Sequence, residues 1–261
     1  MIITSMDNDR VKKYIKLKQK KYRDKYNEFI VEGEHLVDEA IKMNIAKEII
    51  AEAHEKVDFD GNTISLSYDI MKKISTMDTP PKIMALCDKL VPKKKIGDRI
   101  LILDNIQDPG NLGTIIRSAV AFNVDTVILS SDTVDLYNPK VIRSTQGMLF
   151  KVNIIIGNLN EYIEKIKALG IPIYTTNVVN GVDVRTLTKE EKSRYALIVG
   201  NEGNGVSPEI DKLASKKLYI KMNSKTESLN VGVASSILLY ELGDVDEWFS
   251  ICRSYIYYSW Y

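Results

Sequence analysis

The chain has 261 residues, of which 44% are hydrophobic and 27% charged, and its formal net charge is +1. This composition is typical of a globular protein with one large core or two smaller ones. Cys87 and Cys252 lie far apart and His35 and His54 are the only histidines, so a disulfide framework, a zinc site and a Ser-His-Asp triad are poorly supported. The sequence has no signal peptide and no run of about 18 apolar residues, which predicts a cytoplasmic protein.

The first 92 residues mix predicted helices and strands. Periodicity predicts helices over 5–23, 34–43 and 68–75, and strands over 28–33, 46–51, 62–67 and 82–90. Between Arg10 and Lys25 the chain has nine basic residues and one acid, Asp24, with Tyr14 and Tyr22 among them. This basic run fits phosphate binding and fits equally well the solvated face of a helix.

A second pattern follows the lysine-rich segment 93–98, which predicts a linker. Strands are predicted over 99–104, 125–130, 151–156, 171–176, 195–200 and 217–222, and helices over about 111–123, 138–146, 158–169, 208–214 and 229–242. Apolar, β-branched strands that alternate with helices predict an α/β fold with a parallel sheet covered on both faces. The aromatic segment 244–261 fits packing on the body, an interface or disorder.

The stretch QDPGNLGTIIRSA, residues 107–119, joins a predicted strand to a predicted helix. Its apolar residues form one stripe, which leaves Arg117 on another face, one turn beyond Gly113. This arrangement presents an arginine to an anion near the turn, but a surface arginine on an ordinary strand–helix unit has the same pattern. Neither dinucleotide nor P-loop glycine spacing is present, which disfavours a nucleotide-phosphate loop.

Two later stretches carry polar loops at strand ends. Residues 197–207 (LIVGNEGNGVS) place three glycines and two asparagines around Glu202, directly after a strand. Open α/β sheets bind ligands at such carboxyl ends, so this loop predicts a ligand site. Residues 220–241 contain a polar loop and then a helix that is apolar on nearly every side. Such a helix is either central in a monomer or packed against a partner chain.

Taken in order, three segments resemble the motifs of one enzyme family. Residues 104–119 (DNIQDPGNLGTIIRSA), 197–207 and 222–241 (MNSKTESLNVGVASSILLYE) are similar to motifs one, two and three of the SpoU (TrmH-like) RNA ribose 2′-O-methyltransferases, a family of the SPOUT superfamily. The likeness covers residues 99–243. Residues 1–92 are similar to the small L30e-like substrate-binding domain that many members carry.

The resemblance implies a domain order and an activity. An α+β domain (1–92) and a linker (93–98) would precede a parallel-sheet methyltransferase domain (99–243) with a deep trefoil knot, followed by the tail 244–261. The expected protein is a homodimer without metal that uses S-adenosylmethionine to methylate a ribose 2′-hydroxyl of structured RNA. The expected substrate is 23S-type ribosomal RNA, with transfer RNA as a second choice.

The resemblance also assigns residues to roles. Those implied to hold the cofactor are Gly200, Asn201, Glu202, Gly203, Ile220, Met222, Ser228 and Leu229. Those implied at catalytic positions are Asn111, Arg117, Glu202, Ser228 and Asn230. RNA contacts are expected from Arg10, Lys12, Lys13, Lys16, Lys20, Lys21, Arg23 and Arg117.

Arg117 raises a chemical question, because an arginine with a pKa above ~12 is a poor base in water. We expect its guanidinium to hold the phosphate beside the target ribose and to steer the ribose proton there. Three positions depart from the family pattern: Lys221 and Ser224 replace the usual Pro and Gly, and Asn204 replaces a common acid. These departures leave a non-catalytic RNA-binding protein of the same fold as the alternative.

Overall fold

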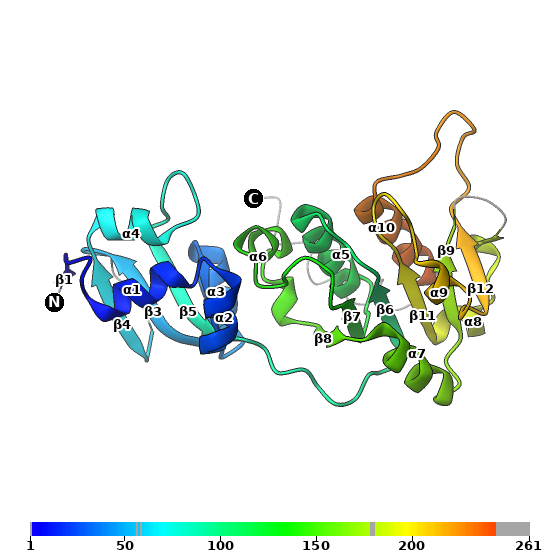
Figure 1. The fold of residues 1–261 in the computed structure, drawn as a ribbon, viewed down its shortest axis with the longest axis horizontal. Coiled ribbons are helices and arrows are strands. Elements are labelled where there is room, and N and C mark those ends of the chain that lie inside the picture. The colour runs from blue at the N-terminus through cyan, green and yellow to red at the C-terminus, as the bar shows by residue number, and fades with distance from the viewer. Residues whose placement is uncertain (1, 56, 58, 178–180, 244–261) are drawn as a thin grey trace, which may run out of the picture. The chain divides into compact units, whose positions relative to one another are not determined.

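The computed structural model describes residues 2–55, 57, 59–177 and 181–243 (Figure 1). Two compact units divide the chain. The first comprises Met1–Lys93, Asp108–Arg117 and Val134–Lys151, and the second comprises Lys94–Gln107, Ser118–Thr133 and the residues from Val152 on. The aromatic segment 244–261, whose role the sequence leaves open, lies outside the described residues.

The first unit is built on a five-stranded mixed sheet with the order β1-β4-β3-β5-β2. Its strands are β1 (Ile2–Ile3), β2 (Glu28–Glu32), β3 (Ala46–Glu52), β4 (Asn62–Leu66) and β5 (Ile83–Asp88). Helices α1 (Asp9–Lys16) and α4 (Tyr68–Ile74) bury apolar side chains in a common cluster with β3, β4 and β5. Helix α3 (Glu34–Lys42) buries Leu36, Val37 and Ala40 and contacts β2, β3 and β5.

The predicted helix 5–23 is interrupted, and α2 (Lys20–Tyr26) follows α1 as a separate helix. In a continuous helix the carbonyls of Leu17 and Lys18 would accept from backbone N–H groups one turn later. Here they accept from the Arg23 guanidinium, at 2.8 and 2.7 Å. The same guanidinium pairs with Asp135 at 2.5 Å, and Arg23 is only 4% exposed. Its predicted contact with RNA is therefore wrong, because the side chain is buried and both of its terminal nitrogens donate to protein acceptors.

Replacing Arg23 with Met is expected to lower the free energy of unfolding by about 3 kcal/mol, because it leaves the Asp135 carboxylate half-buried without its cation. The measurement is urea denaturation followed by circular dichroism. The matched control is Lys20→Met, since Lys20 pairs with Asp24 at 3.5 Å on an exposed face. Its expected effect is about 0.5 kcal/mol or less. Equal effects of the two variants would contradict a structural role for Arg23.

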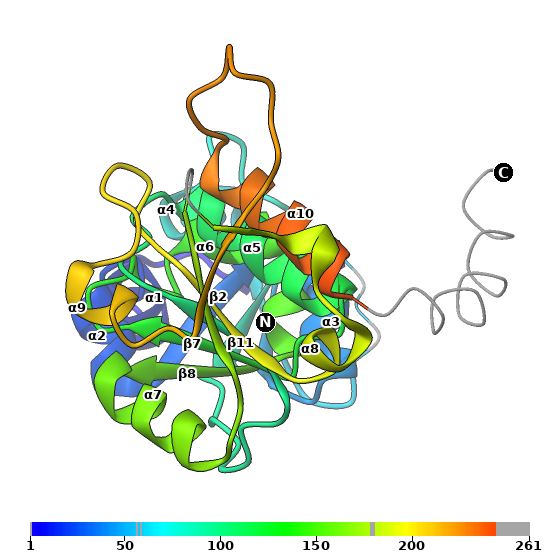
Figure 2. The same ribbon diagram turned by 90° about the vertical axis from the view of Figure 1, so that its right-hand side faces the viewer.

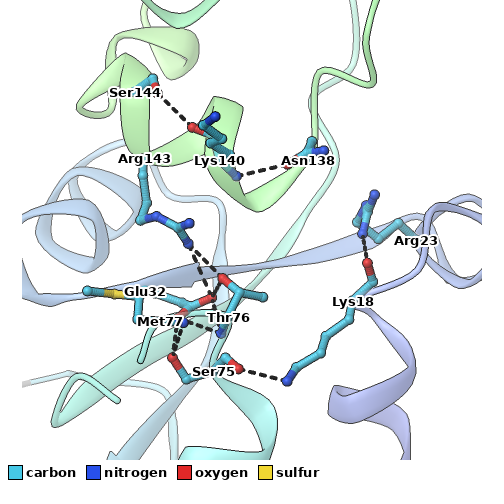
Figure 3. A network of polar contacts seen from close by, with 10 residues as sticks. All are labelled: Lys18, Arg23, Glu32, Ser75, Thr76, Met77, Asn138, Lys140, Arg143 and Ser144. Carbon is cyan, nitrogen blue, oxygen red and sulfur yellow. Dashed lines mark hydrogen bonds and ion pairs between the residues drawn. The ribbon is translucent and has the colours of Figure 1, made fainter. Parts of the chain in front are cut away.

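The segment 134–151 of the first unit contains α6 (Pro139–Thr145) and the short helix η1 (Met148–Phe150). Figure 3 shows Arg143 of α6 pointing at Glu32 and Thr76, and its Nη1 donates to Thr76 Oγ1 at 2.6 Å. The Glu32 carboxylate in turn accepts from Ser75 Oγ at 2.6 Å and from the backbone N–H of Thr76 at 3.1 Å. Lys151 pairs with the buried Glu39 at 2.6 Å. These contacts explain why this segment belongs with residues 1–93.

The second unit contains a seven-stranded parallel sheet with the order β10-β12-β9-β11-β6-β7-β8. Its strands are β6 (Arg99–Leu103), β7 (Thr126–Ser130), β8 (Asn153–Gly157), β9 (Ile173–Thr176), β10 (Val182–Asp183), β11 (Tyr195–Val199) and β12 (Lys216–Tyr219). Six of them confirm predicted strands, and the short β10 was not predicted. The parallel α/β fold is confirmed, while the trefoil knot stays a prediction.

Helices cover both faces of this sheet. Helices α7 (Leu159–Ala168) and α9 (Pro208–Asp211) bury Ile163, Ile166 and Ile210 against strand residues such as Ile100 and Ile198. Helix α10 (Val231–Leu242) lies on the other side of the sheet from α7 (Figure 2). Two further helices are η2 (Val184–Thr186) and α8 (Lys189–Ser193), and neither was predicted.

Asp211 fixes α9 to the sheet. Its carboxylate accepts from Thr175 Oγ1 on β9 at 2.8 Å and from the Lys217 ammonium on β12. Burial by itself raises the pKa of Asp211, but these two hydrogen bonds outweigh burial and leave the pKa below its ordinary value. The loop between β11 and α9 is therefore anchored at its far end.

Candidate functional site

The loop after β11 is a tight backbone turn that only glycine permits at its first position. Asn201 and Gly205 exchange backbone hydrogen bonds at 2.9 Å, and Gly205 has a φ of +69°. A Cβ on Gly200 would lie 2.0 Å from the carbonyl carbon of Gly205 and 2.1 Å from the nitrogen of Val206. Asn201 Oδ1 accepts from the backbone N–H groups of Gly203 and Asn204, at 2.9 and 3.1 Å. The glycines and Asn201 thus set the shape of this loop.

A second loop, after β6, lies against the first. Strands β6 and β11 are parallel neighbours, so their carboxyl ends meet at one edge of the sheet. The Glu202 carboxylate accepts from the backbone N–H of Gln107 at 3.1 Å, and Asn201 Nδ2 donates to the Asn105 carbonyl at 2.8 Å. The N–H of Ser207, which precedes α9, donates to Asp104 at 2.8 Å. These bonds hold Glu202 at the rim of the sheet.

A pocket with a volume of about 260 Å³ opens at the ends of β9, β11 and β12. All eight residues that the resemblance assigns to the cofactor line it. The pocket also has apolar walls from Leu218, Val231 and Leu238. Among the described residues that line it, Glu202 is the one with a charged side chain.

Residues 222–241, the segment similar to motif three, contribute to this pocket through the loop before α10. Ser228 and Leu229 line the pocket, whereas Asn230 caps α10, where its Oδ1 accepts from the N–H groups of Gly232 and Val233 at 2.9 and 3.3 Å. At Lys221 and Ser224, where the family usually has Pro and Gly, no positive φ is required. The turn closes instead through Asn223, which accepts from the backbone of Lys225 and of Thr226 at 3.0 Å. The two departures therefore fit the loop.

Asn111 and Arg117 lie on α5 (Pro109–Ala121), in the part of that helix that belongs to the first unit. The predicted stripe is confirmed, because Leu112, Ile115, Ile116 and Ala119 are fully buried and Arg117 is exposed. A Cβ on Gly113 would lie 2.2 Å from the Ser144 side chain and 2.9 Å from its backbone. Gly113 thus lets α5 approach α6 within this unit.

The basic residues predicted to bind RNA fall into two groups. Arg23 is buried, as described above. Arg10, Lys12, Lys16, Lys20 and Lys21 are exposed, and Lys13 is partly exposed. Arg10 pairs with Glu48 at 3.0 Å, and Lys13 pairs with Glu28 at 2.5 Å. The exposed members remain candidates for phosphate contacts.

Sequence reasoning missed two polar residues of the pocket, Thr176 and Asn177 at the end of β9. The sequence could have indicated them, because Thr176 ends a predicted strand of a parallel sheet and Asn177 follows it, and ligands bind at such strand ends. Within the described residues, no helix is long and apolar enough to cross a membrane and no group of side chains is arranged to hold a metal ion.

Comparison with protein families gives two matches. Residues 98–240 match the SpoU rRNA Methylase family, and residues 8–85 match the MRM3-like substrate binding domain. The second match lies inside the region predicted to bind the substrate.

Individual proteins agree with these matches. The chain is 40% identical over 245 residues to the 23S rRNA (guanosine(2553)-2′-O)-methyltransferase RlmP of Bacillus subtilis, covering 92% of this chain and 98% of the relative. An AdoMet-bound rRNA methyltransferase from Sinorhizobium meliloti superposes with a TM-score of 0.81 at 29% identity, over 93% of this chain and 97% of the other. An RNA 2′-O ribose methyltransferase superposes with a TM-score of 0.78 at 27% identity, over 93% and 98%.

Proposed function

Because this chain belongs to the SpoU rRNA methylase family, we propose that it transfers the methyl group of S-adenosylmethionine to a ribose 2′-hydroxyl of 23S-type ribosomal RNA. The observation that carries the proposal is the pocket between the loops after β11 and β12, which gathers every residue expected at the cofactor. A cytoplasmic location is part of the same proposal.

The pocket fits S-adenosylmethionine in size and chemistry. Its volume of about 260 Å³ is near the lower end of ligand pockets, which begin at about 300 Å³. Leu218, Leu229 and Leu238 offer apolar surface to an adenine ring, and the backbone of residues 200–205 offers donors and acceptors to its polar edge. The Glu202 carboxylate has the sign that suits a positively charged ligand. When bound, the cofactor supplies an activated methyl group on a sulfonium, which leaves readily.

For methyl transfer, the protein must then position the ribose hydroxyl and allow its proton to be removed. We assign to Arg117 the binding of the phosphate next to the target ribose, because its planar fork matches two phosphate oxygens. Asn111, Ser228 and Asn230 are assigned to the polar contacts that orient the ribose. The proton then passes toward the phosphate that Arg117 holds, so no side chain with a pKa near neutrality is needed.

We also propose that the protein is a homodimer that uses α10 as its interface. Val233 and Tyr240 are 47% and 55% exposed, and they lie on one face of this helix because they are seven residues apart. The ring of Tyr240 contacts Phe122 edge-on, with centroids 5.8 Å apart. A helix that buries one face and exposes large apolar side chains on another presents a contact surface.

Tyr240→Lys is expected to convert the dimer to a monomer, because it places a charge in the proposed interface. A cation in the last turn of a helix is compatible with the helix dipole, so the fold should persist. Sedimentation velocity measures the outcome, with circular dichroism as the folding control. An unchanged sedimentation coefficient would remove α10 from the interface, and a wild-type monomer would overturn the dimer itself.

The function is tested by mapping 2′-O-methyl groups in the ribosomal RNA of cells with and without this protein. We expect one ribose methyl group to disappear when the protein is absent. The guanosine named for the B. subtilis relative is the first position to examine. Identical maps would refute the proposal and favour the non-catalytic RNA-binding alternative.

A further inference from the structure

Two tyrosines on α2 form an ordered aromatic pair in the first unit. Tyr22 and Tyr26 are one helical turn apart, with ring centroids 6.4 Å apart and planes 15° from parallel. Tyr26 packs against the apolar cluster beneath α1, so it is the anchored ring. Tyr22 is partly exposed and lies outside that cluster. The outer ring is thus held nearly parallel to a supported inner ring.

Lysines from both helices surround the two rings. The ammonium groups of Lys16 and Lys21 lie 5.7 and 4.8 Å from the Tyr22 centroid. Those of Lys13 and Lys25 lie 5.5 and 5.6 Å from the Tyr26 centroid. Together these residues form a tyrosine–lysine platform, namely Lys13, Lys16, Lys21, Tyr22, Lys25 and Tyr26.

Three lysines of the platform form no ion pair with any described residue. Lys13 pairs with Glu28, but in the described part of the chain no carboxylate forms an ion pair with Lys16, Lys21 or Lys25. Like charges held on one face repel each other and attract a polyanion. Contacts with the tyrosine rings offset this repulsion only weakly, because these side chains are solvated.

We propose that the tyrosine–lysine platform binds an unpaired stretch of the RNA substrate, with one base stacked on Tyr22 and the adjoining phosphates on Lys16, Lys21 and Lys25. The inference rests on the proposed function, which supplies RNA as the partner. A nucleotide has an aromatic face and an anionic linkage, and the platform provides a partner for each. A duplex hides its base faces, so the platform favours single-stranded RNA. An anionic lipid surface would use the lysines without requiring parallel rings.

The test uses the full chain and a twelve-nucleotide oligoadenylate that contains 2-aminopurine. Tyr22→Leu is expected to weaken binding about tenfold, the effect of losing one stacked base, and to abolish the quenching of 2-aminopurine. Tyr22→Phe keeps the ring and is expected to retain both. Tyr68→Leu is the matched control, because Tyr68 is 47% exposed on α4 of the same unit and is expected to change neither.

The charge contribution is tested separately. Replacing Lys16, Lys21 and Lys25 with Gln is expected to reduce the salt slope of single-strand binding by about 2, or about 0.7 for each phosphate contact. The proposal is overturned if Tyr22→Leu binds and quenches like the wild type, if Tyr68→Leu loses as much, or if phosphatidylserine vesicles displace the oligonucleotide from the wild type.

Failure of the platform and failure of the proposed function give different results. If Tyr22→Leu binds the oligonucleotide normally while the wild type methylates ribosomal RNA, the platform alone is wrong. If the wild type binds no S-adenosylmethionine, the proposed function fails, and the 2-aminopurine quenching still decides whether Tyr22 stacks on a base.

Discussion

Arg117→Ala is expected to reduce methyl transfer at least about 100-fold, the range for a group that assists proton transfer, while S-adenosylmethionine still binds. The side chain is exposed on α5, and the stripe that holds this helix does not include it. Removing the guanidinium therefore leaves the fold intact and removes the group assigned to the RNA phosphate. Methyl transfer to ribosomal RNA measures activity, and calorimetry measures cofactor binding.

Two companion variants sharpen this experiment. Arg117→Lys keeps the charge but loses the planar fork, so it is expected to restore only part of the activity. Arg194→Ala is the matched control, because Arg194 is a partly exposed arginine that pairs with Asp98 at 2.8 Å and does not line the pocket. Turnover of Arg117→Ala equal to that of Arg194→Ala would refute the role of Arg117.

Gly200→Ala is expected to abolish detectable binding of S-adenosylmethionine. The added Cβ would lie 2.0 to 2.2 Å from backbone atoms of Gly205 and Val206, and backbone cannot move aside as a flexible side chain does. The turn between Asn201 and Gly205 would have to open, and its N–H and C=O groups would leave the pocket. Calorimetric titration of the cofactor measures the effect.

Gly203→Ala provides the matched control in the same loop. A Cβ there would meet only Asn201 Oδ1, at 3.6 Å, which is an ordinary contact, and Gly203 has no positive φ. Because Gly203 lines the pocket, we expect this variant to weaken the binding of S-adenosylmethionine, but far less than Gly200→Ala does, since the added methyl group displaces no backbone atom. Equal losses of cofactor binding in the two glycine variants would show that the backbone shape at Gly200 does not determine this binding.

The second unit was largely predictable from the sequence, because the central strands of its sheet, such as β6, β7 and β11, are short apolar runs. Runs such as Ile100–Leu103 and Ala196–Val199 are buried on both faces of the sheet, which removes the polar alternation seen at exposed strands. The glycine-rich loop at the end of β11 predicted a ligand site, and the family resemblance implied that S-adenosylmethionine binds there. Thr176 and Asn177 were missed because the segment after β9 has a single glycine, Gly181, whereas three glycines mark the loop after β11.

The first unit was less predictable, because contacts between residues far apart in the sequence determine which of its charged side chains are buried. Arg23 looked like one more cation of a basic helix, yet Asp135, a partner 112 residues away, makes it a buried structural residue. The same applies to Arg143, whose contacts with Glu32 and Thr76 tie α6 to the first sheet. No local pattern near residue 23 or 143 contains that information. A prediction based on a run of basic residues therefore includes residues that are not available to RNA.

The most direct test of the central claim combines the purified protein, unmodified 23S-type ribosomal RNA and S-adenosylmethionine labelled on its methyl group. After transfer, the RNA is digested to nucleosides, which are separated and counted. We expect the label in a single 2′-O-methylated nucleoside, and at least about 100-fold less of it with Arg117→Ala. Label on a base, or no transfer by a protein that binds S-adenosylmethionine and RNA, would contradict it.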